Sequence, residues 1–255
     1  MWILKYNPLR ILSCMCLALC LMCITGCENE DLNPDNQLGE GSIALQLQGN
    51  SIARSTTSII TEEEARLFLV TLYKGTDIVN RQTQLSEFVN LTFPVGYGYK
   101  VSVENITEQD AEALNDNWGA KRYTGLSKSF GIQAGQTTKV TVGCSVANSA
   151  VAVNIADGVE NCTVNVISGE RILSTAESRT AYFNVPENGL RNVTVQVIKN
   201  GEIVSVREFE LSPAQVKDIN IKPGTQEEST ADILVTYDDS FDIIETEVTL
   251  TPDEE

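Results

Sequence analysis

The sequence of 255 residues contains no histidine. Ser-His-Asp and Cys-His nucleophiles, histidine-ligated zinc and the usual acid–base residue near neutral pH all require an imidazole. These kinds of site are excluded, whereas chemistry based on a carboxylate pair or on Ser-Lys is not. We therefore expect a protein that is not an enzyme, with no catalytic residue, no metal site and no cofactor. A carboxylate-dependent hydrolase is the alternative that the abundant Asp and Glu leave open.

Basic residues are also scarce. The chain has 18 Lys and Arg against 35 Asp and Glu, which gives a formal net charge of −17. An anionic surface repels phosphate backbones and anionic lipid headgroups. We therefore expect neither nucleic-acid binding nor docking to a membrane through a basic patch.

Long hydrophobic runs are missing beyond the N-terminal leader. The leader has Lys5 and Arg10 followed by an apolar run, residues 11–24, that is short for a membrane span. Small residues then precede a cysteine in Ile24-Thr25-Gly26-Cys27. This arrangement resembles the signal peptide and lipobox of a bacterial lipoprotein. An ordinary secretory signal and a short uncleaved anchor are the alternatives.

The lipoprotein resemblance implies that residues 1–26 are removed and that Cys27 becomes an N-terminus acylated on both sulfur and nitrogen, with palmitate among the fatty acids. Each buried methylene contributes about 0.8 kcal/mol, so two or three chains hold a protein durably on a membrane. The membrane partner is thus expected to be bound through acyl chains on Cys27. Cleavage removes Lys5 and Arg10 but no acidic residue, so the formal charge becomes −19.

Cysteines available for disulfides are fewer than the total of seven suggests. Four lie in the leader and Cys27 is the expected lipidation site. Only Cys144 and Cys162 remain, and each lies at the edge of a predicted strand. One bridge and two separate buried thiols are both compatible with this pattern.

Residues 27–41 are polar and acidic and carry few bulky apolar side chains. Such a segment cannot bury enough surface to order itself, so we predict a flexible tether. A coil of about fourteen residues separates its ends by roughly 20 Å.

From Ser42 onward the apolar residues repeat with a period of two, which predicts strands, and turn signals recur between them. We predict an all-β fold of two tandem antiparallel Greek-key sandwiches, residues 42–143 and 144–255. A short helix is expected at 108–114. Expected hairpins join 91–93 with 99–104, 130–132 with 138–142, the strands flanking Asn200-Gly201, and 233–237 with 245–250 in a C-terminal hairpin at 231–251.

Four segments resemble a known family of Bacteroidales lipoproteins, described as a domain of unknown function. They are residues 41–47 (GSIALQL), 91–99 (LTFPVGYGY), 118–125 (WGAKRYTG) and 140–148 (VTVGCSVAN). The similarity extends over nearly all of the chain after the leader, and its motifs are turns and core strands. The architecture is also similar to that of anchor and tip subunits of Bacteroidales fimbriae.

The resemblance implies a place in the bacterial outer membrane, because Glu28, Glu30 and Asp31 resemble the signal that exports lipoproteins to the cell surface. A lipid-anchored, surface-exposed protein with a binding, adhesion or fimbria-like accessory role is the expected function. Its ligand would be a protein or a glycan.

The loop at 115–125 carries Trp118, Arg122 and Tyr123. Aromatic faces flanked by hydrogen-bond donors suit carbohydrate rings, so these residues are a candidate ligand platform. This platform supports the alternative function, a glycan-binding lipoprotein associated with a polysaccharide uptake system. The other interpretation is that the aromatic residues pin the loop onto the fold.

Overall fold

The computed structural model describes residues 38–49, 55–58, 60–186, 189–224, 233–244 and 247–252. The chain divides into two units, 1–37 and 38–255. The signal peptide, the lipobox with Cys27, and Glu28, Glu30 and Asp31 lie outside the described residues, so what was expected of them stays a prediction. Among the described residues, no helix is long and apolar enough to cross a membrane.

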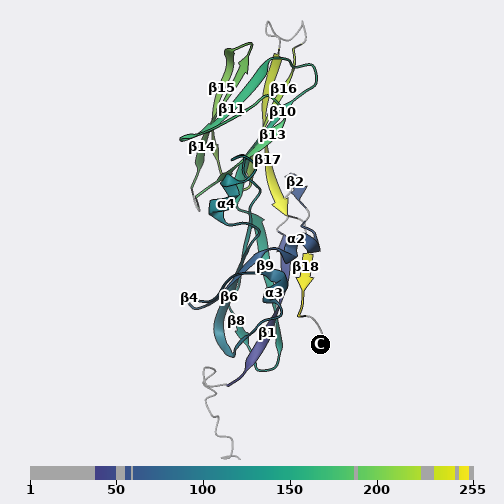
Figure 1. Cartoon of the computed structure of the whole chain (residues 1–255), viewed down its shortest axis with the longest axis vertical. Helices are drawn as coiled ribbons and strands as arrows, with labels where there is room; N and C mark the ends of the chain where they lie inside the picture. The colour runs from purple at the N-terminus through teal and green to yellow at the C-terminus, as the bar shows by residue number, and fades with distance from the viewer. Residues whose placement is uncertain are drawn as a thin grey trace, which may run out of the picture. The chain divides into compact units, whose positions relative to one another are not determined.

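Strands dominate the described part of the chain, which confirms the expected all-β fold (Figure 1). We call the part built on the larger sheet the first lobe. Its strands follow the order β18-β1-β9-β7-β6-β3-β4, with β5 paired to β1 and β8 paired to β6. They are β1 (Glu40–Gly49), β3 (Leu69–Lys74), β4 (Asp77–Gln84), β5 (Thr92–Pro94), β6 (Gly96–Glu104), β7 (Tyr123–Ser127), β8 (Phe130–Ile132), β9 (Thr137–Val146) and β18 (Glu247–Leu250).

Alternating apolar residues form the core of the first lobe. Ile43, Leu45 and Leu47 of β1 are fully buried, as their period of two predicts. The helices α2 (Glu62–Arg66) and α3 (Leu85–Phe88) contribute Ala65, Leu85 and Phe88 to the same core. Because β1 already begins at Glu40 and pairs there with β5, the predicted tether overlaps the sheet by two residues.

The second lobe consists of two sheets that face each other across a valine-rich core. One sheet has the order β13-β10-β16-β17-β2 and the other β12-β11-β14-β15. Its strands are β2 (Ser55–Ser58), β10 (Asn148–Ile155), β11 (Cys162–Ser168), β12 (Arg171–Thr175), β13 (Arg179–Asn184), β14 (Arg191–Lys199), β15 (Glu202–Leu211), β16 (Gln215–Pro223) and β17 (Ile233–Ile244).

One of the expected hairpins is confirmed. Asn200 and Gly201 have φ angles of 53° and 85°, and they connect β14 to its antiparallel neighbour β15. Positive φ at both central residues is the requirement of a tight hairpin turn, and Asn-Gly meets it at low cost. This local signal was sufficient because the two strands are adjacent in sequence.

The other three hairpins are wrong. β5 pairs with β1 and β8 pairs with β6, so neither joins the following strand. In the C-terminal segment β17 pairs with β16, whereas β18 pairs with β1 of the first lobe. Alternation identified the strands, but it carries no information on which distant strand offers the free edge.

The sheets are also not purely antiparallel. β1 runs parallel to β9, β10 runs parallel to β16, and β17 runs parallel to β2. In the first two pairs, the strand that opens a lobe lies beside one reached only after several intervening strands. Parallel neighbours require long crossover connections, and no local turn motif announces such a pairing.

The two cysteines outside the leader and lipobox are separate buried thiols. Cys144 belongs to the core of the first lobe and Cys162 to the core of the second. Burial raises the pKa of Cys144 to about 12. Burial also raises the pKa of Cys162, against the opposing effect of the Lys199 charge.

In a chain that begins at Glu28, we expect neither thiol to react with a disulfide reagent at pH 8 until the protein unfolds.

The unfolded chain ionises Cys144 near its ordinary pKa of 9.0, whereas the folded chain does so at about 12. Stability should therefore fall as the pH rises from 9 towards 12. Denaturant titrations of the wild type and Cys144→Ala test this, because the alanine variant lacks that part of the alkaline loss. Rapid labelling of both thiols in the native protein would contradict the burial.

Candidate functional site

A helix and a left-handed turn connect β6 to β7. The helix α4 (Glu108–Ala113) confirms the prediction, and Thr107 caps it by accepting a hydrogen bond from the Asp110 amide at 3.2 Å. Three consecutive residues after the helix, Asn115 to Asn117, have φ between 54° and 66°. Asn and Asp tolerate this left-handed conformation better than other residues with side chains. The turn directs the next residue, Trp118, away from the helix axis and into the fold.

Trp118 is 4% exposed and belongs to the core of the second lobe. The Arg179 guanidinium lies over its ring at 4.7 Å from the centroid. The ring of Trp118 therefore offers no open face for a sugar. The interpretation in which the aromatic residue pins the loop agrees with this geometry.

Two arginines of the second lobe hold the same loop. Arg179 donates to the Asn115 carbonyl at 2.7 Å and pairs with Asp116 at 3.5 Å. Arg171 donates to the Asn117 carbonyl and pairs with Glu112 of α4 at 3.2 Å. Burial lowers the pKa of Arg171, and the Glu112 charge opposes this effect. We call the segment 108–119, with these contacts, the clasp.

Backbone contacts complete the clasp. Tyr182 of β13 donates its amide to the Trp118 carbonyl at 2.8 Å, and the Asn184 side chain donates to the Glu108 carbonyl at 2.7 Å. Gly119 has φ of 82°, and a Cβ there would lie 2.8 Å from the Ala111 carbonyl oxygen. A side chain at this position would therefore separate the loop from α4.

Arg122 directly precedes β7 and Tyr123 is its first residue, and the two side chains have different surroundings. The Arg122 guanidinium pairs with Glu104 at 3.1 Å and with Glu108 at 3.3 Å, and its side chain is 17% exposed. Tyr123 is half-buried and stacks on Phe68 of the first core, with ring centroids 6.3 Å apart. The three candidate platform residues thus do not form one surface: Arg122 borders the cleft described next, whereas Tyr123 lines a separate, smaller cavity of about 220 Å³ beside Phe68.

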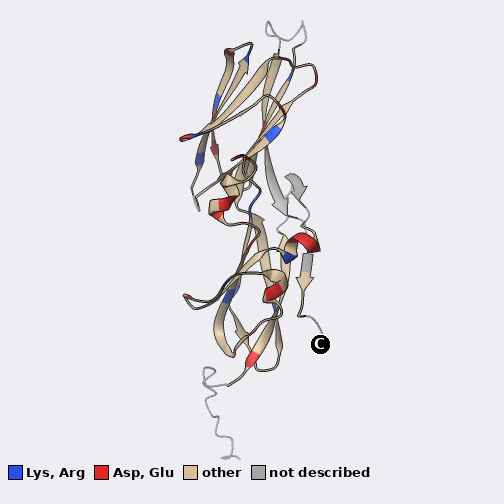
Figure 2. Ribbon diagram, in the orientation of Figure 1, with Lys and Arg blue, Asp and Glu red and all other residues tan. Residues whose placement is uncertain are grey.

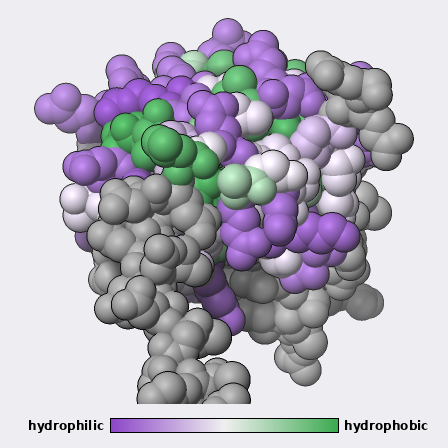
Figure 3. Space-filling model, turned by 90° about the horizontal axis from the view of Figure 1, so that it is seen from below, coloured by the Kyte–Doolittle hydropathy of each residue, from purple (hydrophilic) through white to green (hydrophobic). Residues whose placement is uncertain are grey.

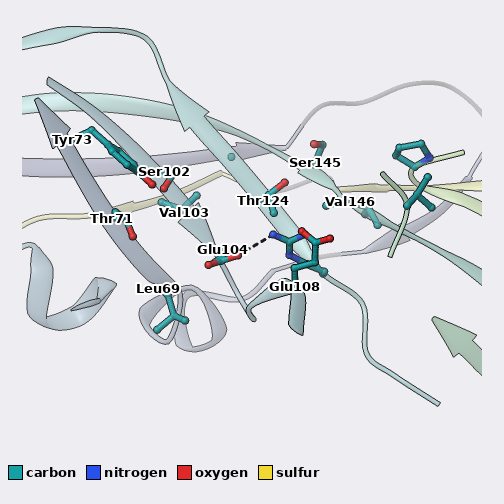
Figure 4. A pocket seen from close by; sticks show the side chains of 15 residues that line it. Leu69, Thr71, Tyr73, Ser102, Val103, Glu104, Glu108, Thr124, Ser145 and Val146 are labelled. Atoms are coloured by element: carbon teal, nitrogen blue, oxygen red, sulfur yellow. Dashed lines mark hydrogen bonds and ion pairs between the residues drawn. The ribbon is translucent and has the colours of Figure 1, made fainter. Parts of the chain in front are cut away.

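The cleft has a volume of about 530 Å³. Its floor is the outer face of the larger sheet, where Leu69, Glu104, Thr124 and Ser145 lie opposite one another in register across β3, β6, β7 and β9. Glu108 of α4 and two residues of the second lobe, Val185 and Pro213, add walls. Figure 4 shows Glu104, Glu108 and Thr124 gathered in the middle of the cleft, with Tyr73 and Ser102 to one side.

Hydroxyl groups line much of this cleft. Thr71 is largely engaged, because its Oγ1 accepts a hydrogen bond from the Gln82 amide at 3.2 Å. Within the described residues, no intramolecular hydrogen bond occupies four other hydroxyls, those of Tyr73, Ser102, Thr124 and Ser145. The sequence contained a signal for Ser102, since polar side chains alternate with the buried valines of β6, but alternation is equally typical of a solvated face.

The family of the chain follows from residues 39–252, which match a family described as a domain of unknown function, DUF4493. The chain belongs to this family. This agrees with the resemblance seen in the sequence, and it assigns no activity to the DUF4493 domain. No curated protein matches the chain.

Solved structures similar to this DUF4493 chain include three fimbrial proteins. A fimbrial assembly protein from Parabacteroides distasonis is 12% identical, with a TM-score of 0.43, over 79% of this chain and 99% of the other. A tip fimbrial protein from Porphyromonas gingivalis is 8% identical, with a TM-score of 0.41 over 79% and 99%. The fimbrial anchor protein of that organism is 8% identical, with a TM-score of 0.37 over 80% and 99%. At these values the likeness carries no argument about function.

Replacing the clasp tryptophan should destabilise the protein strongly. We expect Trp118→Ala to lower the free energy of unfolding by about 3–5 kcal/mol, because it leaves a cavity in the second core and removes the aromatic ring beneath the Arg179 guanidinium. Trp118→Phe keeps an aromatic ring and should lose less. Urea titrations followed by circular dichroism measure both values. A change within about 0.5 kcal/mol of zero for the alanine variant, as for a surface substitution, would contradict the burial.

Proposed function

We propose that the chain is a lipid-anchored binding protein of the bacterial outer membrane, exposed at the cell surface, with a role in adhesion or as an accessory subunit of a fimbria-like assembly. The observation that carries this proposal is the lipobox, Ile24-Thr25-Gly26-Cys27, behind a short apolar leader. The acidic residues Glu28, Glu30 and Asp31 support export to the outer face.

The short distance between anchor and fold supports a tethered binding protein. β1 begins at Glu40, thirteen residues after Cys27. A coil of that length spans roughly 20 Å, so the fold would stay near the membrane without lying in the headgroups. Acidic and basic side chains are interspersed over the described part (Figure 2), and the face shown in Figure 3 is mostly hydrophilic. In this proposal the acyl chains on Cys27 supply the membrane contact.

The cleft supports binding more directly than it supports catalysis. Its volume lies within the range of small-ligand sites, roughly 300–1,000 Å³. Its two carboxylates are both engaged by Arg122, an arrangement that fixes them in place. The proposed role is therefore recognition of a partner or ligand at the surface.

Lipid attachment is tested by Cys27→Ser in the native organism. The wild type should incorporate an alkyne-labelled palmitate analogue and sediment with the outer membrane, and the variant should do neither. Cys144→Ser is the matched control, because it changes a buried thiol and should keep the label. Equal labelling of the wild type and Cys27→Ser would contradict the anchor.

Exposure at the surface is tested separately by treating intact and permeabilised cells with a protease. The proposal expects loss of the protein from intact cells while a periplasmic marker survives. Protection in intact cells and loss only after permeabilisation would place the protein on the periplasmic face and overturn the adhesion role.

A further inference from the structure

We infer that the cleft is a binding site for a neutral oligosaccharide, recognised by the carboxylates of Glu104 and Glu108 and by the hydroxyls of Ser102 and Thr124. This inference names the ligand class for the binding role proposed above and rests on that role. It depends on the cleft alone and not on Trp118.

The first argument is the chemistry of the groups left without partners. Arg122 contacts Oε2 of Glu104 and Oε2 of Glu108, so the second oxygen of each carboxylate can accept further hydrogen bonds. The unoccupied hydroxyls beside them both donate and accept. A ligand that satisfies this set must supply donors to the carboxylates and groups of either kind to the hydroxyls. Sugar hydroxyl groups meet both needs.

The second argument is the spacing of these groups. Glu104 lies opposite Thr124, and Thr124 lies opposite Ser145, on three adjacent strands. Adjacent strands are about 4.8 Å apart, so the row offers polar groups at regular intervals over roughly 10 Å. Ser102 lies two residues before Glu104 on the same face of β6 and begins a second row with Thr71. A chain of linked rings can place successive hydroxyl groups along such rows.

The third argument is charge. Glu104 and Glu108 against Arg122 give the cleft a net charge of −1, and the whole chain carries −17. Sulfated and carboxylated glycans are therefore repelled, both at the cleft and on approach. The half-buried ring of Tyr73 at the side of the cleft adds an aromatic group with a free hydroxyl. Among glycans, a neutral one is therefore favoured over an acidic one, because the negative charge does not repel it.

The test uses the full-length chain, purified in detergent, on an array of neutral, sialylated and sulfated glycans. Isothermal titration calorimetry then measures the dissociation constant of each neutral oligosaccharide that is bound. The expected result is that the protein binds one or more neutral glycans and does not bind the sialylated and sulfated ones. Binding of anionic glycans only, or of no glycan, would overturn the inference.

Variants locate the site. Ser102→Ala and Thr124→Val remove hydroxyls that make no intramolecular hydrogen bond in the described residues, so both should fold like the wild type. Glu104→Gln keeps the shape and removes the charge. We expect the dissociation constant to rise about tenfold or more for Glu104→Gln, because hydrogen bonds to charged groups are the stronger ones. Smaller rises are expected for the two hydroxyl variants.

Thr236→Val is the matched control, since Thr236 is exposed on β17 and does not line the cleft. Unchanged affinity in all three cleft variants, with glycan still bound, would place the site elsewhere and overturn the assignment. The result is distinguishable from failure of the proposed function. If protease removes the protein from intact cells but the protein binds no neutral glycan, the surface role stands and the proposed ligand is wrong. If the protein binds a neutral glycan but is protected in intact cells, the ligand stands and the surface role is wrong.

Discussion

The insertion of Trp118 into the core of the second lobe is the contact on which the described structure depends most. The loop that carries this residue begins in the first lobe, between β6 and β7, and its tryptophan is buried in the other. Three left-handed residues precede it, a conformation that costs roughly 1 kcal/mol or more for each residue with a side chain. Arg171 and Arg179 offset that cost by donating to the carbonyl groups the turn exposes.

The clasp also explains why a cleft exists beside it. Arg171 fixes Glu112 at one end of α4, and this leaves Glu108, at the other end, facing the sheet. Arg122 then joins Glu108 to Glu104 of β6. Without the clasp, the outer face of the sheet would be an ordinary solvated surface of serine and threonine. With the clasp in place, the same serine and threonine residues form the floor of a cleft that Glu108 of α4 borders on one side.

The sequence predicted the positions of the strands better than it predicted which strands pair. Alternating Ile43, Leu45 and Leu47 identified β1, and Asn200-Gly201 identified a hairpin, because both signals are local. The parallel pairing of β1 with β9 and the separation of β17 from β18 depend on contacts between distant residues. No turn residue encodes them, so the expected antiparallel order and the C-terminal hairpin were wrong.

The candidate site was predicted in part for a related reason. Of the three residues grouped as a platform, Arg122 borders the cleft, and Trp118 and Tyr123 were grouped with it because the three are close in sequence. Neighbouring residues of an extended segment face opposite sides, and at the start of β7 Tyr123 packs on Phe68 while the preceding Arg122 faces the cleft. Asn115, Asp116 and Asn117 were the available signal for a left-handed turn that buries the next residue. Glu104 and Glu108 could be found only after the fold had brought them to one guanidinium.

Trp118 is the only tryptophan apart from Trp2 of the leader, so its fluorescence in a Trp2→Phe chain reports the clasp alone. The most direct measurement is quenching of that fluorescence by iodide, in the folded protein and again in denaturant. The account predicts strong protection in the folded protein and full quenching after unfolding. Equal quenching in both states would show that Trp118 is exposed, and neither the clasp nor the cleft built on it would stand.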